Sequence, residues 1–175
     1  LSIELIGTGE QSGTWGDTTN DNLQYGLEEA IVGTVDVAVS TGDTAININT
    51  ASNASQPIRH LRLRLTGSAG GVGNLVIDNS AGGANTFKKN YIITNASNTL
   101  ITVKQDGGTG VDVPAGKSAC VYADGTNVTY AIDYLSGTIV SNDVDIGGGA
   151  IDGTAIGAAT PSSGSFTTLA ASGAV

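Results

Sequence analysis

Apolar and polar side chains alternate along most of the chain between Thr34 and Leu135. The segments VDVAVS, LRLRL, YIIT, ITVK and CVYA show this pattern, and stretches rich in Gly, Ser, Asn and Asp separate them. Alternation is the pattern of a strand with one buried face, because successive side chains point to opposite sides of a sheet. About eight short strands joined by turns are typical of a sandwich or barrel. We therefore predict a mainly β fold, with an antiparallel β-sandwich over residues 34–135.

Two turns in this region predict hairpins. Val35, Val37 and Val39 alternate before the turn TGD, and Ile46 and Ile48 alternate after it, so the two segments are predicted to pair. The dipeptide Asp-Gly at residues 124–125 is a strong hairpin signal of the same kind. The single cysteine of the chain, at position 120, lies in an apolar alternation and is predicted to be a small buried residue.

The one basic cluster of the sequence lies in IRHLRLRL, residues 58–65. Alternation places His60, Arg62 and Arg64 on the polar face of a strand, and Arg59 precedes them. We predict that the three arginines contact acids of a neighbouring protomer or of an acidic partner protein. A solvated strand face that blocks edge pairing is an equally weighted alternative. His60, the only histidine, is predicted to be a surface or interface residue.

The first 33 residues follow a different pattern. LSIELI predicts a short strand, and the segment from Asp17 to Gly33 predicts a helix. Thr18 and Asp21 have the spacing of a capping box, and Gly33 is placed to end the helix. Its apolar face holds Leu23, Leu27, Ala30 and Ile31.

The glycine-rich stretch between this strand and helix invites comparison with a phosphate-binding loop. Its glycines are spaced G-x-G-x-x-x-G, one residue longer than the dinucleotide fingerprint, and no Gly-Lys-Ser/Thr follows. Glu10 and Asp17 would repel a pyrophosphate at the helix N-terminus. We predict instead a structural turn in which the ring of Trp15 is buried.

Charge is distributed unevenly along a chain of formal net charge −9. Residues 1–58 carry eight acids and no Lys or Arg, and all seven bases lie in residues 59–132. Such a balance argues against nucleic acid as a partner, because phosphate binding needs an excess of Lys and Arg. The sequence contains no apolar run of about 18 residues, the length that predicts a membrane span, so no direct membrane partner is expected.

No catalytic or cofactor site is predicted. A lone histidine beside arginines provides no nucleophile–base arrangement. Asp143, Asp145 and Asp152 lack the third ligand position and the terminal Glu of a calcium loop, so turn formation is the favoured interpretation. We expect a non-enzymatic protein without a cofactor.

The last 40 residues, 136–175, contain no Lys or Arg and are rich in glycine. Three isoleucines recur every five residues, a spacing that puts them on one face of neither a helix nor a flat strand. Several chains wound around a shared axis can bury them, since glycines let the backbones approach closely. We predict an intertwined homotrimeric shaft. Its interface residues are predicted to be Ile146, Ile151, Ile156, Phe166 and Leu169.

Three segments together resemble one family. LIGTGEQSGTWGDTTNDNL, VDVPAGKSACVYADGTNVTYAIDYL and IDGTAIGAATPSSGSFTTL are similar, in this order, to segments of bacteriophage tail fibres and related tail structural proteins. The resemblance implies a homotrimeric virion appendage whose N-terminal region anchors to the phage tail and whose distal end reaches a host receptor. Residues 1–33 would be the anchor, 34–135 the sandwich and 136–175 the start of the shaft.

Under this resemblance the partners are other copies of the chain and tail proteins such as nozzle, adaptor or baseplate components. A capsid-mounted fibre or decoration protein remains an alternative, as does a glycan-binding module, whose mark would be exposed aromatic residues clustered in one patch. We also expect the sequence to be a fragment of a longer polypeptide. The residues predicted to dock on the tail are Glu10, Trp15, Asp17, Asp21, Glu28 and Glu29.

Overall fold

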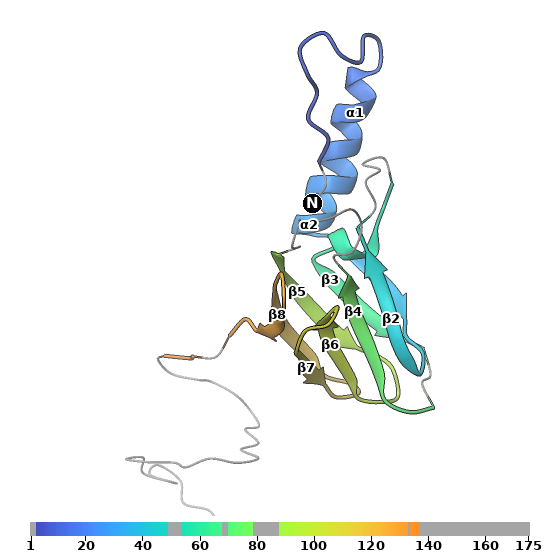
Figure 1. The fold of residues 1–175 in the computed structure, drawn as a ribbon, viewed down its shortest axis with the longest axis vertical. Coiled ribbons are helices and arrows are strands. Elements are labelled where there is room, and N and C mark those ends of the chain that lie inside the picture. Colours follow the sequence, from blue (N-terminus) through green and yellow to red (C-terminus); the bar gives the residue numbers. More distant parts are fainter. Residues whose placement is uncertain (1–2, 49–53, 68–69, 79–87, 133, 137–175) are drawn as a thin grey trace, which may run out of the picture. The chain divides into compact units, whose positions relative to one another are not determined.

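A computed structural model describes residues 3–48, 54–67, 70–78, 88–132 and 134–136 of the 175-residue chain (Figure 1). The chain divides into two units, Leu1–Leu135 and Ser136–Val175. The predicted interface residues of the trimeric shaft lie outside the described residues, and so do Asp143, Asp145 and Asp152. The trimeric shaft therefore stays a prediction; its predicted interface residues are Ile146, Ile151, Ile156, Phe166 and Leu169.

One helical segment follows the glycine-rich turn. It begins before the predicted capping box, and Thr14 at its N-cap makes no side-chain capping hydrogen bond. Thr18 lies inside the helix, so the capping prediction is wrong. The predicted end is confirmed, because the N–H of Gly33 closes the last turn on the carbonyl of Glu29 at 3.1 Å. The segment consists of α1 (Trp15–Asp21), the π-helical stretch η1 (Asn22–Glu28) and α2 (Glu29–Ile31).

Nine strands in the described part of the chain form two sheets, which confirms a mainly β fold. The five-stranded sheet has the order β1-β3-β5-β8-β9, and the four-stranded sheet has the order β2-β4-β6-β7. We call these strands together the two-sheet body. Their bounds are β1 (Thr34–Ala38), β2 (Gly42–Asn47), β3 (Arg62–Thr66), β4 (Gly73–Asp78), β5 (Lys88–Asn95), β6 (Ile101–Gln105), β7 (Gly110–Val113), β8 (Ser118–Asp124) and β9 (Val128–Tyr130).

Both sheets are mixed, so the prediction of a wholly antiparallel fold is wrong. The strands β1, β3 and β5 are parallel neighbours, as are β2, β4 and β6. Only the pairs β5–β8, β6–β7 and β8–β9 are antiparallel. Up to β6, consecutive strands alternate between the two sheets, so the chain winds as a short coil before hairpins reverse it.

The predicted hairpin at the start of the body is an arch instead. Val37 pairs with Leu65 in one sheet, whereas Ile46 pairs with Ile77 in the other. The predicted faces are nevertheless right, because Val37, Val39 and Ile46 are all buried. Alternation determines which side chains face the core, but it is the same for strands paired side by side and for strands facing each other across a core.

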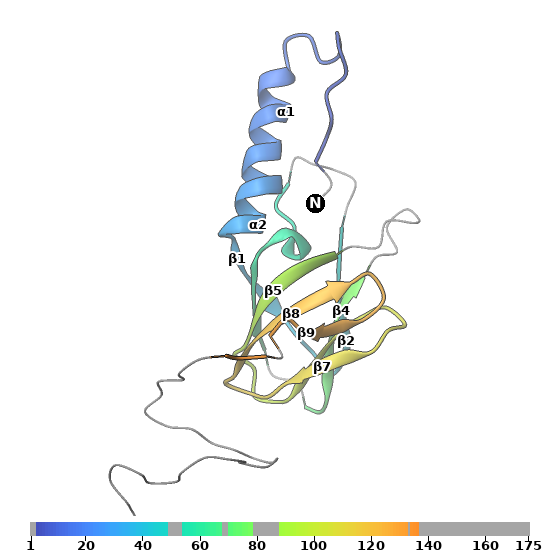
Figure 2. The same cartoon turned by 90° about the vertical axis from the view of Figure 1, so that its left-hand side faces the viewer.

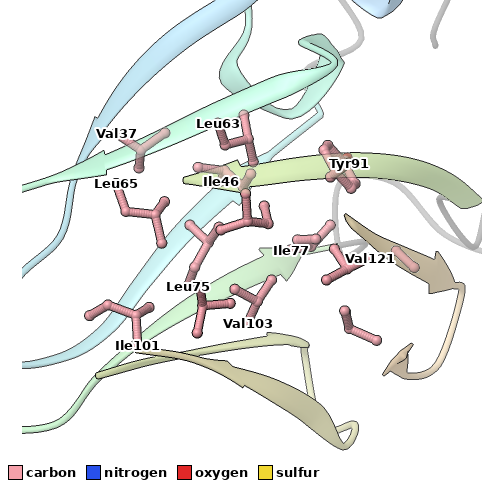
Figure 3. Close-up of a cluster of buried hydrophobic side chains, with 14 of the residues drawn as sticks. Val37, Ile46, Leu63, Leu65, Leu75, Ile77, Tyr91, Ile101, Val103 and Val121 are labelled. Atoms are coloured by element: carbon pink, nitrogen blue, oxygen red, sulfur yellow. The ribbon is translucent and has the colours of Figure 1, made fainter. Parts of the chain in front are cut away.

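The hydrophobic core lies between the two sheets (Figure 3). Leu63 and Leu65 from one sheet and Leu75 and Ile77 from the other belong to one cluster and are fully buried. The prediction that Cys120 is buried is wrong: this residue is exposed, because its neighbours in the alternation face the core.

The hairpin predicted from the Asp-Gly pair is confirmed between β8 and β9. The N–H of Asp124 donates to the carbonyl of Asn127 at 3.0 Å, and Gly125 has a φ of 98°. The carboxylate of Asp124 accepts hydrogen bonds from the N–H groups of Asn127 and Thr126, which lowers the pKa of Asp124.

Candidate functional site: the N-terminal arm and its polar joint

Residues 3–33 form an arm that extends away from the two-sheet body, and we call it the N-terminal arm (Figures 1 and 2). An extended segment runs back along the helical segment from the glycine-rich turn (Figure 2). The strand predicted from LSIELI does not form in the described residues, because residues 3–7 join neither sheet. The arm thus packs mainly on itself.

Side chains of the helix hold the extended segment. The side chain of Asn22 accepts from the N–H of Glu4 at 2.9 Å and donates to its carbonyl at 2.7 Å. Gln11, in the turn before the helix, also donates to the carboxylate of Glu4. Gly26, the buried residue of η1, lets Ile3 approach so closely that a Cβ there would lie 3.1 Å from Cγ1 of Ile3. The closeness explains a glycine inside a helix.

The glycine-rich turn is closed by its own carboxylate. Glu10 accepts a hydrogen bond from the N–H of Gly7 at 2.8 Å, and its own N–H donates to the carbonyl of Gly7 at 3.1 Å. Gly9 and Gly13 have φ values of 84° and 90°, which glycine adopts without strain. The carboxylate therefore takes the N–H that a phosphate-binding loop would offer to its ligand.

Large apolar side chains of the arm are exposed. Trp15 is 63% exposed, so the prediction that its ring is buried is wrong. Leu23, Leu27 and Ile31, the predicted apolar face of the helix, are 53%, 42% and 58% exposed. The face exists as an amphipathic pattern, but no described part of the chain covers it. We call the four apolar residues Trp15, Leu23, Leu27 and Ile31 the four-residue row; they lie at multiples of four positions along the helix, with Thr19 at the position between Trp15 and Leu23.

Backbone hydrogen bonds attach the end of the arm to the body. The N–H of Leu61 donates to the carbonyl of Glu29 at 2.9 Å, and that of Arg62 donates to the carbonyl of Gly33 at 3.0 Å. A Cβ on Gly33 would lie only 2.5 Å from the carbonyl oxygen of Glu29. A glycine is therefore required where the helix ends against the start of β3.

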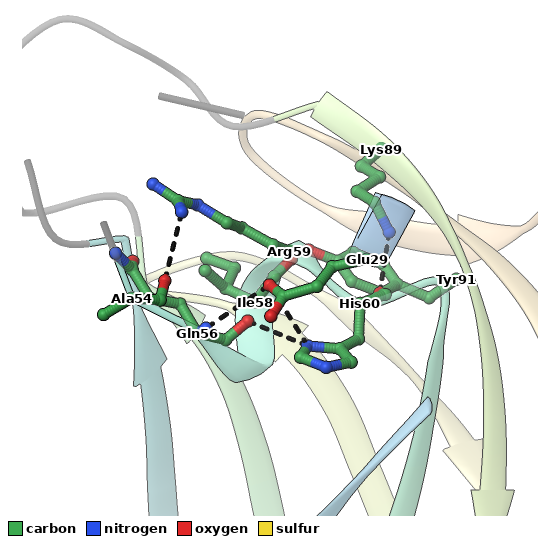
Figure 4. A network of polar contacts seen from close by, with 8 residues as sticks. All are labelled: Glu29, Ala54, Gln56, Ile58, Arg59, His60, Lys89 and Tyr91. Carbon is green, nitrogen blue, oxygen red and sulfur yellow. Dashed lines mark hydrogen bonds and ion pairs between the residues drawn. The ribbon is translucent and has the colours of Figure 1, made fainter. Parts of the chain in front are cut away.

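A cluster of polar side chains surrounds this attachment, and we call it the polar joint (Figure 4). The carboxylate of Glu29, in a residue only 8% exposed, lies 3.4 Å from the N–H of Gln56 and 3.7 Å from Nδ1 of His60. The same His60 nitrogen lies 3.0 Å from the carbonyl of Gln56. The members of the joint are Glu29, Gln56, Arg59, His60, Lys89 and Tyr91.

The body supplies the other half of the joint. Nζ of Lys89 donates to the carbonyl of His60 at 2.7 Å and lies 4.3 Å from the centre of the Tyr91 ring. The hydroxyl of Tyr91 donates to the carbonyl of Ile58 at 2.8 Å. Burial lowers the pKa of Lys89 to about 8 and raises that of Tyr91.

The prediction that His60 is a surface or interface residue is wrong, and Arg59 does not share the outward face of the other two arginines. Both are buried, and Nη1 of Arg59 donates to the carbonyl of Ala54 at 3.2 Å. Burial lowers the pKa of Arg59, and the charge of Glu29 partly restores it. The signal that marks this region is Pro57, which begins the 3₁₀ turn η2 (Pro57–Arg59) and delays the alternating strand until Arg62.

Arg62 and Arg64 do lie on the outer face of β3, as predicted. Nη1 of Arg64 pairs with the carboxylate of Asp36 at 2.8 Å, and Nε of Arg62 donates to the hydroxyl of Thr94 at 3.2 Å. Both contacts are with neighbouring strands of the same sheet. Within the chain these two side chains therefore form part of a solvated strand face.

The residues predicted to dock on the tail all lie on the N-terminal arm. Glu10 closes the turn and Glu29 belongs to the polar joint, so both carboxylates have structural contacts. Trp15, Asp17 and Glu28 are exposed, and Asp21 is partly exposed. A hollow of about 430 Å³ lies at the base of the arm. Its lining includes Gln24, Tyr25, Glu28, Glu29, Val32 and His60.

Comparisons of the chain with protein-family models, with curated proteins and with solved structures find no match. Within the described ranges, no helix is long and apolar enough to cross a membrane. No group of three or more His, Cys, Asp or Glu side chains in the same part of the chain is placed to hold a metal ion.

Proposed function

We propose that this chain is the anchoring region of a phage tail fibre, a structural protein of the virion without catalytic activity, which attaches the fibre to the tail and supports attachment to the host cell. The observation that carries the proposal is the N-terminal arm. It exposes large apolar side chains, among them Trp15 at 63%, at the end of a segment fixed to the body by the polar joint. Exposed apolar groups gathered on one element mark interaction surfaces.

The proposal assigns a task to each region. The N-terminal arm docks on a tail protein such as a nozzle, adaptor or baseplate component, and the two-sheet body forms a collar. Residues 136–175 wind with two further copies into the shaft. The sequence resemblance to tail fibres supports this assignment along the length of the chain.

A reconstruction of the intact particle tests the proposal. We expect density for the arm against a tail component and the body outside it. Density for the chain on the capsid would favour the alternative of a capsid-mounted fibre or decoration protein. A particle that lacks the chain would refute both.

The trimer has a separate test in solution. We expect the mass of the 175-residue chain to be that of three copies, and we expect Ile151→Asp to lower it, because a charge cannot be buried on the shared axis. A monomer before substitution would refute the shaft.

The glycan-binding alternative is not favoured by the placement of the two neighbouring exposed tyrosines. Tyr130 is paired with Val121, and paired residues of neighbouring strands point to the same side of a sheet, which for Val121 is the core side. Tyr122 is the next residue after Val121 on β8, so its side chain points to the opposite side. Tyr122 and Tyr130 therefore do not form one aromatic platform.

A further inference from the structure

We propose that the four-residue row docks into an apolar groove of a separate protein whose rim carries Lys or Arg. The inference rests on the proposed anchoring function and names the chemistry of the surface that the arm binds. It combines three observations: an aligned apolar row, an arm with acidic charge alone, and an acidic hollow beside the row.

The helix geometry keeps the row on one face. In an α-helix, residues four apart advance slightly beyond a full turn, so a row of this spacing drifts around the helix. In a π-helix the turn is wider, and the same spacing falls slightly short of a full turn. The π-helical stretch Asn22–Glu28 therefore reverses the drift of α1 and keeps Leu23, Leu27 and Ile31 aligned.

The charge of the arm selects the kind of partner. Residues 3–33 carry six acids and no Lys or Arg. A second copy of the arm would bring the same acids alongside, and like charges at an interface are unfavourable. Anionic membranes and nucleic acids are disfavoured for the same reason. An apolar groove with a basic rim fits both the row and its charge.

The hollow at the base of the arm provides a place for a basic side chain. It lies on the neighbouring side of the helix, because Gln24, Glu28 and Val32 line it and each directly follows a member of the row. The carboxylate of Glu29 is engaged in the polar joint. Glu28 is exposed and makes no ion pair with the described residues. We infer that Glu28 receives a Lys or Arg of the partner beside the Tyr25 ring.

The native tryptophan makes the inference testable with the whole chain. Trp15 is the only tryptophan of the sequence and belongs to the row, so its fluorescence reports on this surface alone. The probes are two synthetic amphipathic helical peptides with identical leucine faces, one with lysines and one with glutamates elsewhere. We expect the lysine peptide to shift the emission to shorter wavelength and to bind about tenfold or more tightly than the glutamate peptide.

Matched variants separate the row and the hollow from general attraction. We expect Leu27→Gln to weaken binding of the lysine peptide by about tenfold, as for the loss of an apolar anchor. Glu28→Gln should weaken it about twofold to fivefold, the range of an exposed ion pair. Val72→Gln changes an apolar side chain of the body that is 65% exposed, and Asp106→Asn removes the same charge as Glu28→Gln. Both controls should leave binding unchanged.

Several results would overturn the inference. These are equal binding of the two peptides, no binding of the lysine peptide, or equal weakening by Asp106→Asn and Glu28→Gln. An emission shift that grows with the concentration of the chain alone would show that arms of different copies cover each other. None of these results bears on where the chain lies in the particle, so the anchoring function fails or stands by the reconstruction.

Discussion

The N-terminal arm and the two-sheet body are both built from amphipathic elements, but only the body buries its apolar faces within the chain. Leu63 and Leu75 are fully buried between the sheets, whereas Leu23 and Leu27 on the arm are 53% and 42% exposed. In the body, two sheets present matching faces to each other. A single helix with an extended segment along one side has no second layer. The difference shows that an amphipathic pattern specifies a face and leaves open what covers it.

The largest difference in stability is expected when a leucine of the body and a leucine of the arm are each replaced. Leu63→Ala should lower the free energy of unfolding by about 2–5 kcal/mol, because it leaves a cavity in a close-packed core. Leu27→Ala should change it by no more than about 0.5 kcal/mol, as for an exposed substitution. Urea denaturation measures both. Similar losses would break the comparison, since they would mean that Leu27 is covered in the isolated protein.

The next largest loss of stability is expected when a buried side-chain amide of the body is removed. Nδ2 of Asn95 donates to the carbonyls of Thr99 and Val113 at 2.8 and 2.7 Å, and Oδ1 accepts from the N–H of Ser97 at 3.0 Å. Asn95→Ala should cost about 2 kcal/mol or more, because buried partners lose their hydrogen bonds.

The matched control for this amide is Asn74→Ala. Nδ2 of Asn74 donates to the carboxylate of Asp43 at 2.6 Å on the outer face of the four-stranded sheet. Water can replace this contact, so we expect a loss below about 0.5 kcal/mol. Urea denaturation again gives both values, and a loss at Asn74 as large as that at Asn95 would contradict the burial argument.

Much of the body could be predicted from the sequence, because alternation is a local property. The inward faces around Val37, Val39 and Ile46 and the hairpin at Asp124 were predictable on this basis. The partners of the strands were not. Whether β1 pairs with β2 or faces it across the core depends on segments far along the chain, and the local pattern is the same in both cases.

The polar joint was harder to predict than the core. Extending the alternation of β3 back to His60 placed this side chain on the outer face of the sheet. In the structure the 3₁₀ turn η2 precedes β3, so the alternation of the strand does not reach His60. Glu29 and His60 are far apart in sequence and come together only through the attachment of the arm. The helix was predictable in its existence and its end, but its start at Trp15 has no side-chain cap to signal it.

A smaller effect is expected where the two regions meet. In Gly33→Ala, the new Cβ would lie 2.5 Å from the carbonyl oxygen of Glu29, so the end of the helix must move. We expect a loss of about 1–3 kcal/mol, with faster hydrogen exchange at the N–H of Leu61, which bonds to that carbonyl.

Gly16 in α1 is the matched glycine, since nothing lies within 4 Å of a Cβ placed there. Gly16→Ala should be neutral or stabilising by up to about 1 kcal/mol, because alanine favours a helix. If both substitutions had the same effect on exchange at Leu61, the attachment of the arm would not depend on the close approach at Gly33.

The last expected effect is a dependence of stability on pH, and it comes from the polar joint. Burial lowers the pKa of Lys89 in the folded protein from 10.5 to about 8. Between these values the unfolded chain binds more protons than the folded chain, so Lys89 makes the free energy of unfolding rise with pH. Below about pH 8 the side chain is protonated in both states, so its destabilising effect on the folded chain no longer changes with pH.

Lys89→Met keeps an unbranched apolar side chain near the Tyr91 ring and removes the titration. The melting temperature of the original chain should therefore rise relative to that of the variant between about pH 8 and pH 10.5. Lys117→Met, at an exposed turn of the body, should produce no such change. A difference between Lys89→Met and the original chain that stays constant with pH would show that the ammonium of Lys89 is well hydrated, and that the joint is as open to water as the arm it holds.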